Sequence, residues 1–310
     1  MRRAPITRSV RHLALLAAVL GTSLFAGCAG ETQGSTSFVQ PLAFAAAKSP
    51  KDLYVADFGA NAVELLGNSS YKSAGSITDG IAGPVDVVLD EQGRLYVANT
   101  DGGDVTEYAA GKTGPPSFTY SKGMQNPYSV AVDAHGNLFE GDENGSMNEY
   151  AQGVNKTVAT CTAAGVIFGL AVDSGGNVFA AYFGKPFGPL NVVEYRGGLS
   201  GSCKAKALTT SSAPGGVALD KNGKLLVAEG TEVLVIDPRH ANAAVKIGSG
   251  FSGALSVRLN EANTRAFVTD NATNEVTVVS YPAGKNLTVL GAGNGLKEPR
   301  AAVDFPNAVY

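Results

Sequence analysis

Similar segments recur along the chain at an interval of about forty residues. The segment "LYVADFGANAV" begins at Leu53, and "LYVANTDGGDV" begins at Leu95. Related segments begin at Leu138, Val178, Leu225 and Ala266, at intervals of 40 to 47 residues. Self-similarity at this interval indicates one supersecondary unit per repeat, and each unit is too small to bury its apolar faces alone.

Each repeat alternates apolar and polar residues with a period of two. The second repeat reads as the strands "VDVVLD", "RLYVAN", "DVTEY" and "SFTYS", separated by turns. The first turn recurs as "DEQGRL", "DAHGNL", "DSGGNV" and "DKNGKL", in which Asp accepts backbone hydrogen bonds and Gly supplies a positive φ. Four short antiparallel strands per repeat are typical of a β-propeller blade.

The first strand of this pattern occurs six times, and the count predicts the closure of the ring. These strands are Val85–Asp90, Tyr128–Asp133, Phe168–Asp173, Gly215–Asp220, Leu255–Asn260 and Arg300–Asp304. The repeats start at a second strand, near residue 51, and stop after a first strand. The sequence therefore predicts an all-β, six-bladed propeller over residues 51–310, whose C-terminal strand joins the N-terminal blade and leaves no open sheet edge.

Two whole repeats carry a family resemblance. The segments "PVDVVLDEQGRLYVANTDGGDVTEY" and "PYSVAVDAHGNLFEGDENGSMNEY" resemble NHL-type propeller repeats of exported bacterial proteins. The resemblance spans about residues 51–310. It implies the propeller fold, and it implies no particular activity because propellers include enzymes, binding modules and scaffolds.

The N-terminal residues are typical of an export signal. A basic start is followed by an apolar run and by "LFAGC", which ends at Cys28 and resembles a bacterial lipobox, with Phe25 where Leu is usual. This resemblance implies cleavage and lipidation at Cys28, so that residues 1–28 form the signal. An ordinary signal peptide is the alternative, and it would leave the protein periplasmic or secreted. Residues 29–50 are rich in small residues and are interpreted as a flexible tether.

Charge and composition limit the partners. Removing the signal removes four of the 24 Lys and Arg residues and none of the 27 Asp and Glu residues, so the formal net charge becomes 20 − 27 = −7. An acidic chain of this kind is not expected to bind nucleic acid. We expect membrane attachment only through the N-terminal lipid, a monomeric protein of the cell envelope, and an envelope protein or a saccharide as partner.

A polar column follows the second strand of each repeat. It consists of Asp57, Asn99, Asp142, Tyr182, Glu229 and Asp270. Carboxylate and amide groups at one end of a propeller could bind Ca²⁺, Mg²⁺ or a sugar, or they could satisfy backbone N–H groups of the adjacent loops. Glu140 breaks an otherwise Val or Ala column, where an unpaired buried carboxylate would cost several kcal/mol. With Asp142 it belongs to the acidic segment "EGDEN", the second candidate cation site.

Other exceptional residues lie on the first strands, which surround the channel. Arg258 stands where four repeats have Ala and one has Val, and Arg300 aligns with small residues and with Asp86. We predict that Asp86 and Arg300 pair across the ring closure. Tyr128 and Phe168, at the starts of their strands, are candidates for the channel mouth. The longer loop containing Tyr182, Phe183 and Phe187 is a candidate partner surface.

The remaining aromatic residues and the cysteines are given structural roles. Tyr54, Tyr96, Phe139, Phe179 and Phe267 form a column predicted to pack between blades. Cys161 and Cys203 could pair in an oxidising compartment, but their spacing to the following strands places them at different heights on adjacent outer strands, which argues against a bond.

The sequence favours a non-catalytic binding or scaffolding role. His135 and His240 fall in turns, and no histidine ligand set or nucleophile triad is visible. No cofactor is predicted apart from the Ca²⁺ or Mg²⁺ considered above. The alternative is a metal-dependent propeller hydrolase or lyase, similar to gluconolactonases or streptogramin lyases, which would need an all-carboxylate site.

Overall fold

The computed structural model describes residues 52–163, 165–184, 190–209, 214–240, 244–260 and 262–304. The predicted signal, the tether and Cys28 lie outside these residues. No helix among the described residues has the length and apolar character needed to cross a membrane.

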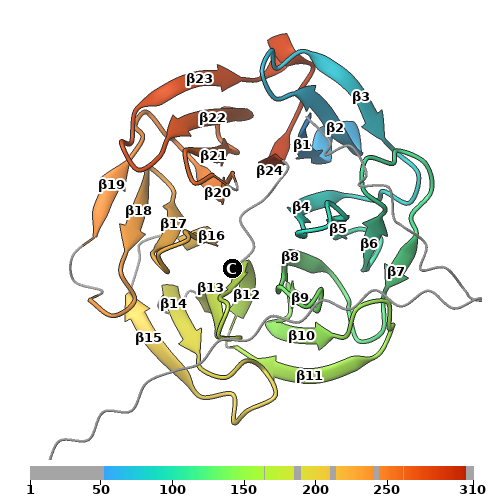
Figure 1. Ribbon diagram of the computed structural model, residues 1–310, viewed down its shortest axis with the longest axis vertical. Helices are drawn as coiled ribbons and strands as arrows, with labels where there is room; N and C mark the ends of the chain where they lie inside the picture. Colours follow the sequence, from blue (N-terminus) through green and yellow to red (C-terminus); the bar gives the residue numbers. More distant parts are fainter. Residues whose placement is uncertain are drawn as a thin grey trace, which may run out of the picture. The chain divides into compact units, whose positions relative to one another are not determined.

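Six four-stranded antiparallel sheets are arranged in a ring, which confirms the predicted six-bladed propeller (Figure 1). Blade 1 consists of β24 (Pro299–Asp304), β1 (Asp52–Asp57), β2 (Ala62–Gly67) and β3 (Ser73–Ile77), with a 3-10 turn η1 (Phe58–Ala60) between β1 and β2. Blade 2 consists of β4 (Pro84–Leu89), β5 (Leu95–Asn99), β6 (Asp104–Tyr108) and β7 (Phe118–Tyr120). Blade 3 consists of β8 (Pro127–Val132), β9 (Leu138–Asp142), β10 (Ser146–Tyr150) and β11 (Thr157–Thr162).

The second half of the ring repeats the plan. Blade 4 consists of β12 (Gly165–Val172), β13 (Val178–Gly184), β14 (Leu190–Tyr195) and β15 (Ala205–Thr209). Blade 5 consists of β16 (Pro214–Leu219), β17 (Leu225–Glu229), β18 (Glu232–Ile236) and β19 (Val245–Ile247). Blade 6 consists of β20 (Ala254–Leu259), β21 (Arg265–Asp270), β22 (Glu275–Ser280) and β23 (Asn286–Leu290), followed by η2 (Ala292–Asn294).

The core lies between neighbouring blades. Tyr96 of blade 2, for example, packs with Val130 and Leu138 of blade 3. All five residues of the aromatic column are buried, with at most 3% of their surface exposed, which confirms the predicted packing role. Each blade therefore buries both of its faces only through its neighbours, as the repeat interval requires.

Closure of the ring follows the prediction, but the register of the closing strand does not. β24 pairs with β1 so that Pro299 faces Asp57, as Pro84 faces Asn99 in blade 2. Arg300 therefore corresponds to Val85, whereas the sequence alignment placed it with Asp86. A slip of one residue reverses the direction of every side chain on a strand, so this correction changes what Arg300 contacts.

The same register places Asp304 opposite Leu53, the position that Leu89 occupies opposite Leu95 in blade 2. Asp304 is buried, and this burial raises its pKa to about 7 in spite of the nearby Arg265.

Cys161 and Cys203 form a disulfide, so the argument against this bond was wrong. Cys161 lies in β11, but Cys203 lies in the loop between β14 and β15 and not on an outer strand. The loop brings its Cα to 5.5 Å from that of Cys161. The bond joins the outer part of blade 3 to blade 4.

Candidate functional site

Every innermost strand has a β-bulge in its N-terminal half. In blade 2 the pairing passes from Pro84–Asn99 to Asp86–Ala98, so that Val85 is left unpaired. The equivalent unpaired residues are Val85, Tyr128, Phe168, Gly215 with Gly216, Leu255 and Arg300. Because a bulge redirects side chains and ends regular pairing, it opens the inner wall of the ring at this level.

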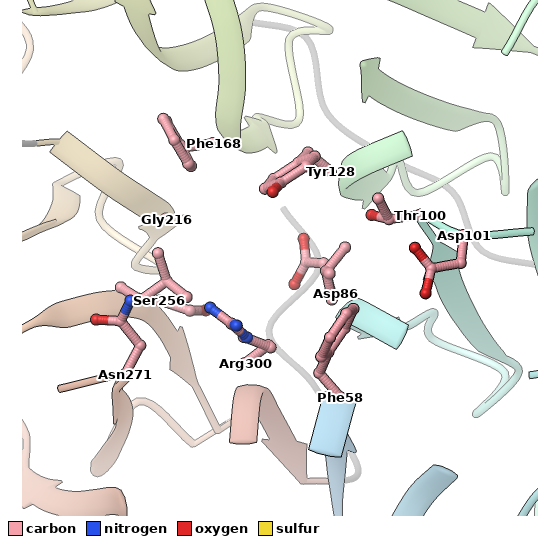
Figure 2. Close-up of a pocket in the computed structure, with 12 residues that line it drawn as sticks. Phe58, Asp86, Thr100, Asp101, Tyr128, Phe168, Gly216, Ser256, Asn271 and Arg300 are labelled. Atoms are coloured by element: carbon pink, nitrogen blue, oxygen red, sulfur yellow. The ribbon is translucent and has the colours of Figure 1, made fainter. Parts of the chain in front are cut away.

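These bulges surround a cavity of about 260 Å³, the channel-mouth cavity (Figure 2). All six blades contribute to its lining. The lining residues are Phe58, Val85, Asp86, Thr100, Asp101, Tyr128, Phe168, Gly216, Leu255, Ser256, Asn271 and Arg300. Phe58 comes from η1, and the polar residues Thr100, Asp101 and Asn271 come from loops that follow second strands.

Aromatic rings form much of the wall. Tyr128 and Phe168 lie at the mouth, where the sequence placed them as candidates, and their rings meet at 87° with centroids 5.7 Å apart. The guanidinium of Arg300 lies over the ring of Phe58, 5.3 Å from its centroid, in a cation–π arrangement. The cavity therefore offers flat apolar faces beside one cation.

The predicted Asp86–Arg300 pair is wrong, because both residues have other partners. Arg300 Nη2 donates to Glu298 Oε1, whereas Asp86 Oδ2 accepts from Arg258 Nη2 at 2.5 Å. The cause is the register of β24, which places Arg300 at the bulge and not opposite Asp86.

Arg258 lies across the channel and contacts three other blades. Besides Asp86 in β4, its guanidinium donates to the carbonyl oxygens of Val217 in β16, at 2.8 Å, and Val130 in β8, at 3.2 Å. Blades 3, 4 and 5 have Ala at this position, so the long side chain has room to reach the opposite wall. Hydrogen bonds from one side chain thus connect four of the six blades at the centre of the ring.

Asp86 is almost fully buried and well satisfied. Its Oδ1 accepts from the N–H of Val87 at 2.9 Å, and its Oδ2 accepts from the N–H of Val130 at 3.0 Å as well as from Arg258. Burial raises the pKa of Asp86, and Arg258 with the two N–H donors opposes that rise. The ion pair of Asp86 and Arg258 has no net charge, and Asp86 contributes to the lining of the cavity.

The polar column lies at the same end of the ring, but backbone groups already engage most of its oxygens. Asp57 accepts from the N–H groups of Lys297 and Glu298 at 2.7 and 2.8 Å. Asp142 accepts likewise from Gln125, Asn126 and Asn144, Asp270 accepts from Ser252, Ala272 and Thr273, and Asn99 accepts from Ala82. These bonds fix the loop that enters each blade, which accounts for the column without a cation.

The other members of the predicted face lie apart from the cavity lining. Tyr182 is half-buried in β13 and packs against the core between blades 3 and 4, and Glu229 ends β17 and is buried. Phe187 lies outside the described residues. The side chains of His135 and His240 are 84% and 77% exposed. Within the described ranges, no group of three His, Cys, Asp or Glu side chains is placed to hold a metal ion.

Glu140 is fully buried between blades 2 and 3, and among the described residues it has a single hydrogen-bond partner. Its Oε2 accepts from Asn148 Nδ2 at 2.9 Å, and no residue within the described ranges forms a hydrogen bond with its Oε1. Asn148 Oδ1 in turn accepts from the exposed Thr160 hydroxyl at 2.8 Å. Desolvation raises the pKa of Glu140 to about 8, with a smaller contribution from Asp142 and opposition from Asn148. The carboxyl is therefore held largely protonated at neutral pH.

A second hollow adjoins the channel-mouth cavity and shares Phe168, Leu255 and Asn271 with it. This annex has a volume of about 350 Å³ and is bounded mainly by small or apolar residues. Its other lining residues are Phe183, Pro214, Gly215, Gly230, Gly253 and Ala254. Gly215 is required here, because a Cβ at this position would lie 2.1 Å from the carbonyl oxygen of Leu255.

Sequence reasoning missed Phe58, Val85, Leu255 and Asn271 as lining residues. A signal for the ring was present, since a proline precedes four of the bulge residues. These prolines are Pro84, Pro127, Pro214 and Pro299. Proline is confined to the starts and bulges of central strands, so the residue after each one could have been read as a bulge position.

No protein-family model and no curated protein match the sequence. Solved structures do match. A chain in the crystal structure of a nidogen/laminin complex has a TM-score of 0.66 at 14% identity, and the match covers 81% of this chain and 97% of that chain. A functionally unknown protein from Desulfotomaculum acetoxidans DSM 771 has a TM-score of 0.59 at 13% identity, over 82% and 99% of the two chains. At these identities the likeness shows the fold alone, and the NHL-type resemblance stays a prediction.

Proposed function

We propose that this protein is a non-catalytic binding or scaffolding propeller with NHL-type repeats, exported and anchored through a lipid on Cys28. Its ligand or partner enters the channel-mouth cavity. The observation that carries this proposal is the ring of bulges, because every blade contributes a residue to one concave site, where apolar and aromatic side chains meet convergent polar groups, as in many ligand sites.

A metal-dependent hydrolase or lyase is the weaker alternative. It requires carboxylates with free oxygens, whereas Asp57, Asp142 and Asp270 accept backbone hydrogen bonds that position their loops. The nidogen/laminin neighbour belongs to a complex between proteins, which is consistent with a binding role for a propeller of this kind.

A fragment screen tests the binding role. Saturation-transfer NMR on the full chain would use neutral, cationic and anionic ring compounds, and we expect a subset to bind and to be lost in the variant Tyr128→Ala/Phe168→Ala. The matched control is Leu287→Ala/Val289→Ala, which removes two apolar side chains that are about half exposed on β23. Fragment binding unaffected by Tyr128→Ala/Phe168→Ala, or lactone turnover abolished by a chelator, would contradict the proposal.

The anchor is tested separately. Cells expressing the full chain would be labelled with a palmitate analogue, and the label should appear on the wild type and be absent from Cys28→Ser. An unlabelled wild type in the soluble fraction would support the ordinary signal peptide instead.

A further inference from the structure

Five of the six bulge positions around the channel-mouth cavity carry apolar or aromatic side chains or none. They are Val85, Tyr128, Phe168, Gly215 with Gly216, and Leu255. The sixth is Arg300, the one charged side chain that a bulge aims at the cavity. At the level of the bulges a ligand therefore meets an apolar wall and one guanidinium, and the polar side chains of the adjacent loops and strands line the rest of the cavity.

Arg300 has donors that the protein does not use. Among the described residues, the one hydrogen bond of its guanidinium is from Nη2 to Glu298, with which it forms an ion pair, so Nη1 is left without an acceptor. Its Nε is buried and has no hydrogen-bond partner among the described residues, so a carboxylate in the cavity would reach the guanidinium at its terminal nitrogens. Guanidinium groups bind planar carboxylates through two parallel hydrogen bonds.

Glu298 already forms an ion pair with Arg300, so a ligand carboxylate shares the guanidinium with it. The two aspartates that line the cavity do not pair with Arg300. Asp86 is neutralised by Arg258, and both of its oxygens already accept hydrogen bonds. Asp101 also lines the cavity, but it is exposed to solvent, which screens its charge. Figure 2 shows Asp101 and Arg300 on opposite sides of Asp86, so an anion on Arg300 need not approach Asp101.

The apolar part of the ligand has two places to lie. Phe58, Tyr128 and Phe168 offer ring faces beside Arg300, and the gap at Gly215 and Gly216 opens toward the annex. The channel-mouth cavity alone, at about 260 Å³, is near the lower limit for a drug-sized ligand. The annex would give a ligand room for an aliphatic chain or for a second ring.

We propose that the channel-mouth cavity binds small carboxylates with an aromatic or aliphatic body, with the carboxylate on Arg300 and the body between the aromatic side chains. This inference rests on the proposed binding function and adds the ligand class.

Matched acids and amides test the charge requirement. Phenylacetate and hexanoate would be compared with phenylacetamide and hexanamide by calorimetric or NMR titration of the full chain. We expect each acid to bind roughly tenfold or more tightly than its amide, since a charge-assisted hydrogen bond contributes about 1.5–3 kcal/mol. In Arg300→Gln the preference should shrink to about twofold or less.

Two further variants make the result specific. Arg300→Lys keeps the charge but loses the planar fork, and we expect an intermediate preference. Arg196→Gln is the matched control, because Arg196 is 68% exposed and pairs with Glu194 away from the cavity. Thermal unfolding of each variant would show that it folds.

The outcomes separate this inference from the proposed function. Equal binding of acid and amide, or an acid preference that survives Arg300→Gln, overturns the carboxylate assignment. If neither acids nor amides bind but other fragments of the screen do, the ligand class is wrong and the binding role stands. If no fragment of any charge binds, both proposals fail.

Discussion

Two carboxyl groups of this propeller are buried, Asp86 in the channel and Glu140 between blades 2 and 3. Burial makes the ionised form of each unfavourable, and the protein offsets this desolvation cost in a different way at each site. Asp86 is 3% exposed and accepts hydrogen bonds from two backbone N–H groups and one guanidinium. Glu140 is 0% exposed and accepts one hydrogen bond from an amide.

The difference shows that burial alone does not decide the charge of a carboxyl. Asp86 has a cation within hydrogen-bond distance, so its ionised form is part of a neutral pair that spans the ring. In the part of the chain that the structure describes, Glu140 forms no ion pair with a cation, and so the proton itself removes the charge. The first arrangement makes stability depend on a partner residue, and the second makes it depend on pH.

Removing the cation from the channel should have the largest effect. Arg258→Met leaves Asp86 buried without its ion-pair partner, and we expect the free energy of unfolding to fall by about 4 kcal/mol. Urea unfolding of the full chain measures this value. The double variant Asp86→Ser/Arg258→Met should recover most of it, because blades 3 and 6 have Ser at the position of Asp86. A double variant as unstable as Arg258→Met would show that Asp86 is not the source of the loss.

The pH dependence of Glu140 should come next in size. Its pKa of about 8 lies above the ordinary value of 4.5, so the folded state keeps a proton that the unfolded state loses. The stability of the wild type should therefore decrease as the pH rises from about 5 to 8. Glu140→Gln cannot lose this proton, and we expect its stability relative to the wild type to improve by about 3 kcal/mol between pH 5 and pH 8.

Urea unfolding at several pH values checks this dependence. Asp304, whose pKa is also raised, contributes equally to both proteins, so it cancels in the difference. A constant difference between wild type and Glu140→Gln across the range would mean that Glu140 is ionised throughout.

The smallest effect should come from the amide partner. Asn148→Ala removes the donor to Glu140 and the acceptor for Thr160, and we expect a loss of about 1 kcal/mol at pH 5. At pH 9, where Glu140 is charged, the loss should be greater. A double-mutant cycle with Glu140→Gln would measure the coupling, and zero coupling at both pH values would remove Asn148 from the account of Glu140.

The fold was predictable because the repeat contains the information several times over. One interval, one turn and one aromatic column recur, so an error in any single repeat does not change the count of blades. The seam has no such redundancy. Its inner strand comes from the C-terminus, and there the alignment slipped by one residue, which gave Arg300 the wrong neighbours.

The site was predictable only in part, because its residues are exceptions to the repeat. Tyr128 and Phe168 were recognised from their place at the starts of strands. The partner of Asp86 was not, because Arg258 comes from blade 6, two blades away around the ring, and the reach of a side chain across a channel is not encoded by strand periodicity. The disulfide was missed for a similar reason, since loop geometry places Cys203.

The position of Arg258 in the channel affects how a ligand enters and leaves the channel-mouth cavity. Its guanidinium binds groups from the inner strands of blades 2, 3 and 5, below the level of the bulges. A molecule in the channel-mouth cavity therefore arrives and departs by the same mouth, and it does not pass through the ring. Anything that covers that mouth slows entry and escape together, so a cap would lengthen residence time without changing affinity.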